Sequence, residues 1–407
     1  MKLKVDTLKL IAIFFVGFFL PWGANFIEVG GYPPAYFIIS TFILAIFMFF
    51  TGISLPWAFR LFVVFLLLHL AVTIMIFGGD YLFLEQIQAR SLNSGTVYSV
   101  SESNLLLIEK MVFLLFFFIV IYSVIKKKNE WLTLAASFVA GLGAVCLLKL
   151  KFIIATFPEV RFAGAYDDSN AFGVSACLAF FLAILLFNTV KKVTFRVILF
   201  SASIFFLIMI LLSQSRGALV ALLCASLIVL KENRRFAFKL LLITIAIALI
   251  FFCFFKVLIP SRFLTPETWV DDRGSNRLDI WWIYLSSVWN FFLTGTGFLR
   301  EKDVISTGVL GYEYIPHNVF LEILIDFGVA GLFLFCFFLK KLWLKLRHFP
   351  KSSFYAPVLK TIFVSWIIGA FFISSFILRE TWLVFALIAT APALYRNHEQ
   401  QAKIESL

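Results

Sequence analysis

The sequence predicts an all-α integral membrane protein with about twelve transmembrane helices and one long outward loop. Of its 407 residues, 62% are hydrophobic and only 14% are charged, whereas soluble domains are about half apolar and about a quarter charged. A helix needs about 20 apolar residues to cross a hydrocarbon core of about 30 Å. Twelve apolar runs can be counted on that basis, so an ordinary soluble enzyme is excluded.

The twelve predicted spans divide the chain into three parts. Residues 1–259 contain nine spans, residues 260–317 form the long loop, and residues 318–407 contain three spans and a tail. The first run follows three lysines but has no small-residue cleavage site, so we expect it to remain as a span. The predicted spans are 8–22, 35–53, 57–78, 105–125, 131–153, 170–190, 197–213, 216–230, 239–259, 318–339, 356–377 and 381–395.

Basic residues are divided unequally between alternate loops. Loops on one side carry 22 of the 35 Lys and Arg residues, which leaves 13 for the other side. An excess of Lys and Arg marks the cytoplasmic side, so both termini are predicted to be cytoplasmic. The net charge of +12 then reflects topology, and no nucleic-acid partner is expected. The five cysteines lie in apolar runs without a CxxC or CxxH pattern, which indicates neither a zinc site nor a disulfide framework.

Polar clusters fall on the opposite, outward face of the predicted membrane protein. Because they share one face, we expect them to build one site there. The clusters are Arg161 with Asp167, Asp168 and Asn170; Ser213 to Arg216; Arg277; His317; and Arg379 with Glu380.

The run after Arg216 is short for a membrane span. Residues 217–230 are 14 residues, or about 21 Å of helix at about 1.5 Å per residue. We therefore expect this helix to begin before Arg216 and to place the guanidinium about one turn inside the membrane. An arginine at that depth usually faces a wet cavity or a partner, and Ser213 and Ser215 favour a polar recess over simple snorkelling to the headgroups.

His317 and Asn318 open the tenth predicted span. The positive end of a helix favours the neutral form of a histidine, which is the form that a general base needs. Glu322 and Asp326 follow Asn318 at intervals of four, so all three share one helix face. Carboxylates inside a span must face protein, water or a basic partner. Structural pairing, with Arg379 or Arg216 as the basic partner, and a catalytic role both remain open.

Several motifs together resemble the O-antigen ligase and O-antigen polymerase superfamily. The resemblance covers mainly the second half of the chain, and the motifs stand in the same order. They are RFAGAYDDSNAFG at 161–173, LSQSRGALV at 212–220, RLDIWW at 277–282, GTGF at 295–298, PHNVFLE at 316–322 and FGVAG at 327–331.

The resemblance implies a GT-C-like polytopic glycosyltransferase of the bacterial inner membrane, with its site at the periplasmic face. Its donor would be a glycan on undecaprenyl diphosphate within the lipid bilayer. As a ligase it would transfer O-antigen to lipid A-core, and as a polymerase it would join two lipid-linked glycans. Neither a metal nor another cofactor is implied, and the choice between ligase and polymerase remains open.

The expected chemistry assigns roles to the polar residues. A diphosphate leaving group needs fixed positive charge, and the planar guanidinium binds phosphate oxygens in pairs. Arg216 and Arg277 are therefore predicted to bind the diphosphate, and His317 is predicted to take the proton of the acceptor hydroxyl, with inversion at the anomeric carbon. Seven further residues are predicted to bind substrate: Arg161, Asp168, Asn170, Ser213, Ser215, Asn318 and Glu322.

Two other functions are compatible with parts of the sequence. Twelve spans with cytoplasmic termini are also common in transporters and flippases, although those usually bind their substrates near the midplane between two repeats. A metal-dependent glycosyltransferase is the second alternative, with Asp167–Asp168 or Asp271–Asp272 as the acidic pair.

Overall fold

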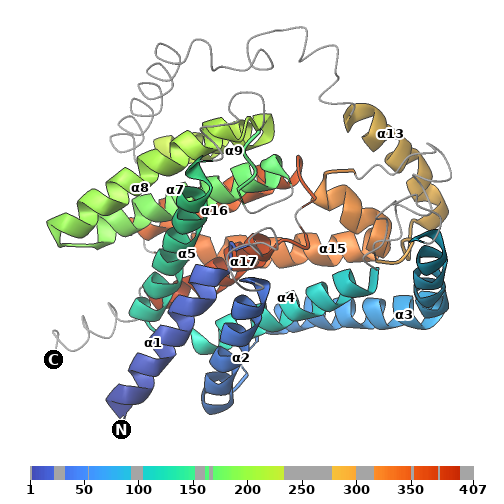
Figure 1. Cartoon of the computed structure of the whole chain (residues 1–407), viewed down its shortest axis with the longest axis horizontal. Coiled ribbons are helices and arrows are strands. Elements are labelled where there is room, and N and C mark those ends of the chain that lie inside the picture. Colours follow the sequence, from blue (N-terminus) through green and yellow to red (C-terminus); the bar gives the residue numbers. More distant parts are fainter. Residues whose placement is uncertain are drawn as a thin grey trace, which may run out of the picture.

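The computed structural model describes residues 2–22, 33–53, 55–92, 104–151, 161–164, 168–232, 277–298, 316–349, 353–374 and 376–394. Within these ranges every regular element is a helix and no strand occurs (Figure 1). The prediction of an all-α fold is therefore confirmed for the described residues. The ninth predicted span, 239–259, and most of the 260–317 loop lie outside them.

The helices follow the predicted apolar runs along the described ranges. Five of them are long and apolar enough to cross a membrane, namely 57–75, 128–148, 169–189, 193–212 and 319–347, and three shorter apolar helices lie at 35–51, 216–227 and 355–370. The count of twelve spans, the domain boundaries and the orientation stay predictions. The observed bounds are α1 Lys2–Phe19, α2 Pro33–Thr51, α3 Trp57–Leu92, α4 Asn104–Val124, α5 Lys128–Leu148, α7 Ser169–Thr189, α8 Val193–Leu212, α9 Arg216–Glu232, α13 Arg277–Ser287, η2 Val288–Phe291, α15 Val319–Arg347, α16 Tyr355–Ala370, α17 Arg379–Thr390 and η4 Ala391–Leu394.

Two helices continue well past the C-terminal ends of the apolar runs that predicted them. α3 continues to Leu92, well past the predicted end at residue 78, because residues 80–92 contain no proline and are rich in helix-forming Leu, Gln, Glu and Ala. α15 continues to Arg347 and therefore includes the basic residues Lys340, Lys341 and Lys345. Part of the interval 79–104 between the third and fourth predicted spans is thus helical.

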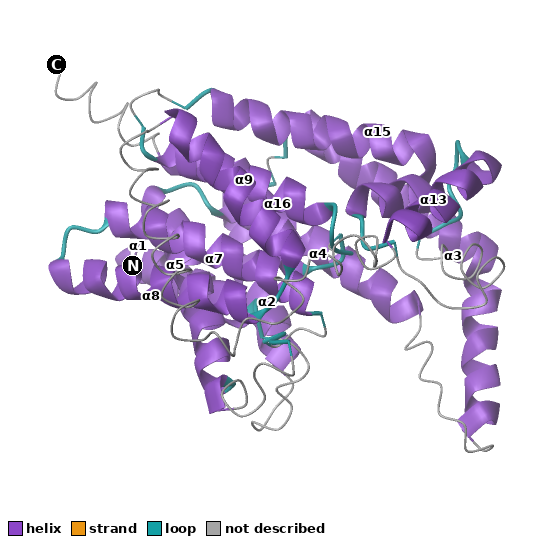
Figure 2. Cartoon of the chain, turned by 90° about the horizontal axis from the view of Figure 1, so that it is seen from above, coloured by secondary structure: helices purple, strands orange, loops and turns teal. Residues whose placement is uncertain are grey.

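α7 is the central helix of the bundle. It is buried along almost its whole length and packs against α5, α8, α9 and α16 (Figures 1 and 2). Small residues permit this close packing: a Cβ on Gly173 would lie only 2.8 Å from Ala218 Cβ of α9. The register between α7 and α9 therefore depends on the absence of a side chain at Gly173.

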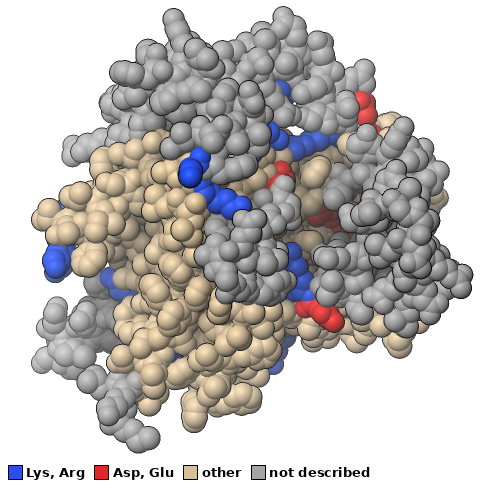
Figure 3. All heavy atoms as spheres, viewed as in Figure 1, with Lys and Arg blue, Asp and Glu red and all other residues tan. Residues whose placement is uncertain are grey.

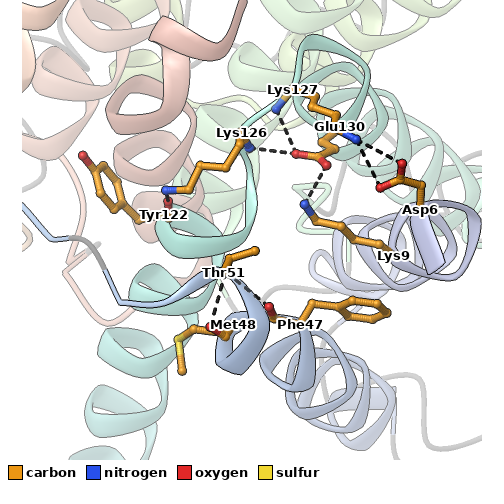
Figure 4. Close-up of polar contacts among 9 residues, drawn as sticks. All are labelled: Asp6, Lys9, Phe47, Met48, Thr51, Tyr122, Lys126, Lys127 and Glu130. Atoms are coloured by element: carbon orange, nitrogen blue, oxygen red, sulfur yellow. Dashed lines mark hydrogen bonds and ion pairs between the residues drawn. The ribbon is translucent and has the colours of Figure 1, made fainter. Parts of the chain in front are cut away.

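A buried ion pair joins α1 to the start of α5. Lys9 Nζ donates to Glu130 Oε1 over 2.6 Å, and Glu130 Oε2 accepts from the backbone amides of Lys126 and Lys127 (Figure 4). Asp6 pairs with Lys127 at the surface nearby. These contacts bring together two basic segments, 2–9 and 126–128, that are both predicted to lie on the cytoplasmic side.

Candidate functional site

Three helix starts meet around Phe371 and Phe372, which follow the end of α16. Gly217, the second residue of α9, packs so closely on Phe372 that an added Cβ would lie 2.6 Å from the Phe372 Cβ. The Arg277 guanidinium at the start of α13 lies 6.0 Å from the centre of the Phe372 ring. Phe320, in the first turn of α15, has its ring centre 4.8 Å from that of Phe371. The two phenylalanines thus connect the segments that carry Arg216, Arg277 and His317.

A hydrogen-bond network supports the turn before α9. Asn170 Oδ1 accepts from Arg161 Nη2 and from Ser215 Oγ, both over 2.9 Å. Arg161 Nε also donates to the Ser213 carbonyl over 3.3 Å. Asp168 Oδ1 accepts from both nitrogens of Asn170, so it caps α7 and orients the Asn170 amide. These five predicted site residues therefore lie together and are joined by hydrogen bonds.

α9 begins at Arg216, so the expectation of an earlier helix start was wrong. The preceding residues form a turn in which Gln214 adopts a φ of 50°. The Ser215 hydroxyl accepts from Ala218 N over 3.2 Å and therefore caps the helix. Arg216 is half-buried and its Nε atom is shielded from solvent, so the guanidinium lies partly inside the protein although the helix does not begin before it. The polar recess stays a prediction.

His317 lies directly before the cap of α15 and has a φ of 48°. Such a conformation is uncommon for residues other than glycine, and strained backbone of this kind clusters at functional sites. His317 and Gln214 are the only non-glycine residues with positive φ in the described part of the chain. The Asn318 side chain accepts from the amides of Phe320 and Leu321, and Trp281 Nε1 donates to the Pro316 carbonyl over 2.7 Å.

The two carboxylates of α15 lie where the spacing predicted, in its first half. Asp326 is buried, and Glu322 is half-buried with its Oε1 atom shielded from solvent. Arg379 was one candidate partner for them. Its Nη1 atom instead donates to the carbonyls of Leu20 and Trp22 at the end of α1. Arg379 therefore ties the first helix to the start of α17.

Among the described residues visible in Figure 3 charged side chains are few, and basic and acidic groups come close together near the middle of the view. In the described ranges no group of three or more His, Cys, Asp or Glu side chains is placed to hold a metal ion. Asp167 and the Asp271–Asp272 pair lie outside those ranges. Independence from metals and cofactors stays a prediction.

Sequence reasoning missed the roles of Phe371, Phe372 and Gly217. The two phenylalanines are hard to single out because the chain has 54 of them. Gly217 directly follows Arg216, and a glycine beside a candidate site residue was the sequence feature that could have indicated a close contact there. The two tryptophans of the RLDIWW motif differ in exposure and contacts: Trp282 is 73% exposed, whereas the Trp281 indole donates to the Pro316 carbonyl.

Residues 201–336 match the family model described as O-antigen ligase. The resemblance to the O-antigen ligase superfamily is thus confirmed. The matched O-antigen ligase segment runs from α8 into α15 and contains Arg216, Arg277 and His317. The match supports a function of the O-antigen ligase or polymerase type, with lipid-linked glycan substrates in a membrane. A comparison with curated proteins finds no match.

Proposed function

We propose that this chain is an inverting glycosyltransferase that transfers an undecaprenyl-diphosphate-linked O-antigen glycan to lipid A-core at the periplasmic face of the inner membrane. The observation that carries the proposal is the position of the two arginines. Arg216 is the first residue of α9 and Arg277 is the first residue of α13, and both helix starts contact Phe372.

This arrangement suits a diphosphate. The start of a helix carries partial positive charge and free backbone amides, which favour phosphate groups. A guanidinium at each start adds full charges and paired donors. In a site shielded from water such groups stabilise developing negative charge far better than they do in bulk solvent. Arg216 and Arg277 therefore stabilise the diphosphate as its bond to the sugar breaks.

His317 acts as the general base in this proposal. The acceptor hydroxyl oxygen attacks the anomeric carbon, the bond from that carbon to the diphosphate oxygen breaks, and the hydroxyl proton passes to His317. One direct displacement inverts the anomeric configuration. The Trp281–Pro316 hydrogen bond keeps the His317 segment beside α13, so the base and one diphosphate-binding arginine are carried by neighbouring segments.

The remaining predicted residues have two kinds of role. The network of Arg161, Asp168, Asn170, Ser213 and Ser215 positions the start of α9, and Asn318 caps α15. Glu322 lies in the first turn of α15, and in this proposal its carboxylate binds the glycan or orients His317. We keep the polymerase as the alternative function, because the same site could join two lipid-linked glycans.

A lipopolysaccharide gel tests the proposal. The strain would lack this gene and carry wild type, Arg216→Ala, Arg277→Ala or His317→Ala at equal abundance. Bare core with accumulated lipid-linked polymer, restored only by wild type, supports the ligase. Core carrying a single repeat supports the polymerase. An unchanged ladder in the deletion strain rejects both for lipopolysaccharide and favours another glycan or a transporter.

A further inference from the structure

α15 is interrupted one-third of the way along. Gly328 has a φ of 67° and a ψ of −173°, a conformation that residues with a Cβ rarely adopt. The break separates a first half, residues 319–327, from a second half, residues 329–347. Backbone groups next to a break lose their helical partners, and unsatisfied backbone is costly at membrane depth. The break therefore needs partners from elsewhere.

The loop at 292–298 supplies those partners. Thr296 N donates to the Ile325 carbonyl over 2.7 Å, and Gly297 N donates to the Asp326 carbonyl over 3.1 Å. In the other direction, Val329 N donates to the Phe292 carbonyl over 2.8 Å. The GTGF and FGVAG motifs thus lie against each other at the break, where Gly295 and Gly328 approach closely. Gly295 and Gly328 permit the contact, because a Cβ on either would collide with backbone of the other segment.

This pairing joins the two halves of the candidate site. The 292–298 loop directly follows α13 and η2, so it belongs to the segment that begins with Arg277. A separate hydrophobic cluster packs the same segment on the first half of α15, and it consists of Ile280, Tyr284, Val288, Leu321 and Ile325. α13, the loop and residues 316–327 therefore form one packed unit with Arg277 and His317 at the same end.

His69 connects this packed unit to α3. Its Nε2 atom lies 3.0 Å from the Asp326 carbonyl oxygen, and its ring centre lies 4.7 Å from that of Phe327. A carbonyl oxygen only accepts, so Nε2 must carry a proton and donate it. The Asp326 carbonyl thus accepts from Gly297 N and from His69, using both lone pairs at the point where the helix breaks.

We infer that His69 is a positioning residue for glycan transfer. Its hydrogen bond fixes the broken end of the first half of α15 relative to α3, and thereby fixes the packed unit that carries His317 and Arg277 relative to the rest of the bundle, which includes α9 with Arg216. This inference rests on the proposed function. A displacement of about 1 Å in a reacting group can cost about 100-fold in rate, so loss of this hydrogen bond should lower turnover even though His69 touches no substrate.

Three variants separate the hydrogen bond from the packing of the ring. His69→Phe keeps a ring against Phe65 and Phe327 but removes the donor. His69→Met also removes the donor and replaces the ring with a flexible apolar side chain, should the Phe variant not accumulate. His69→Gln retains an N–H donor at a similar reach. Leu68→Phe is the matched control, since Leu68 is 62% exposed on the same helix.

The assay uses full-length protein in lipid nanodiscs with undecaprenyl-diphosphate-linked O-antigen and lipid A-core. We expect kcat to fall about tenfold or more in His69→Phe, with KM for the donor within about twofold because Arg216 and Arg277 are unchanged. His69→Gln should recover most of the kcat, and Leu68→Phe should match wild type. Amide hydrogen exchange in segments 292–298 and 319–327 should rise in His69→Phe and not in His69→Gln.

The possible failures can be told apart. If wild type itself transfers no glycan, the proposed function fails and the inference fails with it. If wild type is active and His69→Phe keeps its kcat, only the inference fails. If His69→Gln is as slow as His69→Phe, donation by residue 69 is not the cause and the inference is again overturned.

Discussion

Arg216 and Arg277 occupy equivalent positions, each as the first residue of its helix. A lysine at these positions would keep the charge but lose the planar arrangement of donors that pairs with phosphate oxygens. Charge and geometry can therefore be separated experimentally at each site. Both arginines have Phe372 nearby, because Gly217 beside Arg216 packs on Phe372 and the Arg277 guanidinium lies 6.0 Å from the centre of its ring.

Replacement of Arg216 or Arg277 by Ala should lower kcat about 100- to 1,000-fold, since each removes a preorganised group from the developing diphosphate charge. The Lys variants should retain part of the activity. Arg196→Ala is the matched control, because that guanidinium lies over the Phe187 ring near the other end of α8. Equal activity of Arg216→Ala and Arg196→Ala in the transfer assay would contradict the assignment.

His317 must be tested against its backbone conformation as well as its chemistry. His317→Asn and His317→Gly both tolerate a positive φ and both lack a base of suitable pKa. If His317 is the base, each should lose about 100- to 10,000-fold in kcat, with donor binding little changed. Wild-type turnover in His317→Gly would show that the position requires only the backbone conformation.

At the scale of elements, the residues at the helix starts position the candidate site. Asp168 caps α7, Ser215 caps α9 and Asn318 caps α15, so the caps and the predicted site residues are the same or adjacent residues. The opposite end of the bundle is tied by the buried pair Lys9–Glu130. The contacts at the first end position the candidate site, whereas the ion pair at the other end stabilises the fold, so each can be tested separately.

Asn170→Leu should lower turnover without unfolding the protein. The change removes the oxygen that accepts from Arg161 and Ser215, so the start of α9 loses its support while most of α7 keeps its packing. We expect kcat to fall about tenfold or more. Asn188→Leu at the other end of α7, where the amide donates to the Ile184 carbonyl, is the control. Identical losses in both variants would point to general damage to α7.

Lys9→Met should destabilise the fold, because it leaves the Glu130 carboxylate buried without its cation. Removal of one partner of a buried pair costs about 3–5 kcal/mol. The double variant Lys9→Met/Glu130→Gln should recover much of the loss, since Gln keeps an acceptor for the amides of Lys126 and Lys127. Thermal unfolding in detergent measures both. A double variant no more stable than Lys9→Met would reject this account of the pair.

At the scale of the whole molecule, the predicted orientation places all the catalytic groups on one side of the membrane. Cysteine labelling tests this directly in protein whose five native cysteines have been replaced. Thr294→Cys should react with a membrane-impermeant maleimide in intact spheroplasts, and Asn129→Cys should react only after permeabilisation. Both positions are exposed. The reverse labelling pattern would show that the orientation is opposite to the predicted one, and it would contradict a periplasmic site.

The sequence by itself determined the helical class, the positions of most helices and the identity of the polar residues. Apolar runs in a chain with few charges leave the backbone no alternative to helices in a bilayer, and buried charges are too costly to occur there by chance. The motifs at 212–220, 277–282 and 316–322 therefore mark the candidate site in the sequence alone.

Only the tertiary structure decided how these residues are arranged. The start of α9 at Arg216 depends on a serine cap and on an Asn170 contact 45 residues away in sequence. The break in α15 depends on backbone pairing with residues 292–298 and on His69, which is 257 residues from Asp326. Hydropathy and helical periodicity contain only local information, whereas caps, breaks and close glycine contacts are set by segments that meet only when the chain folds.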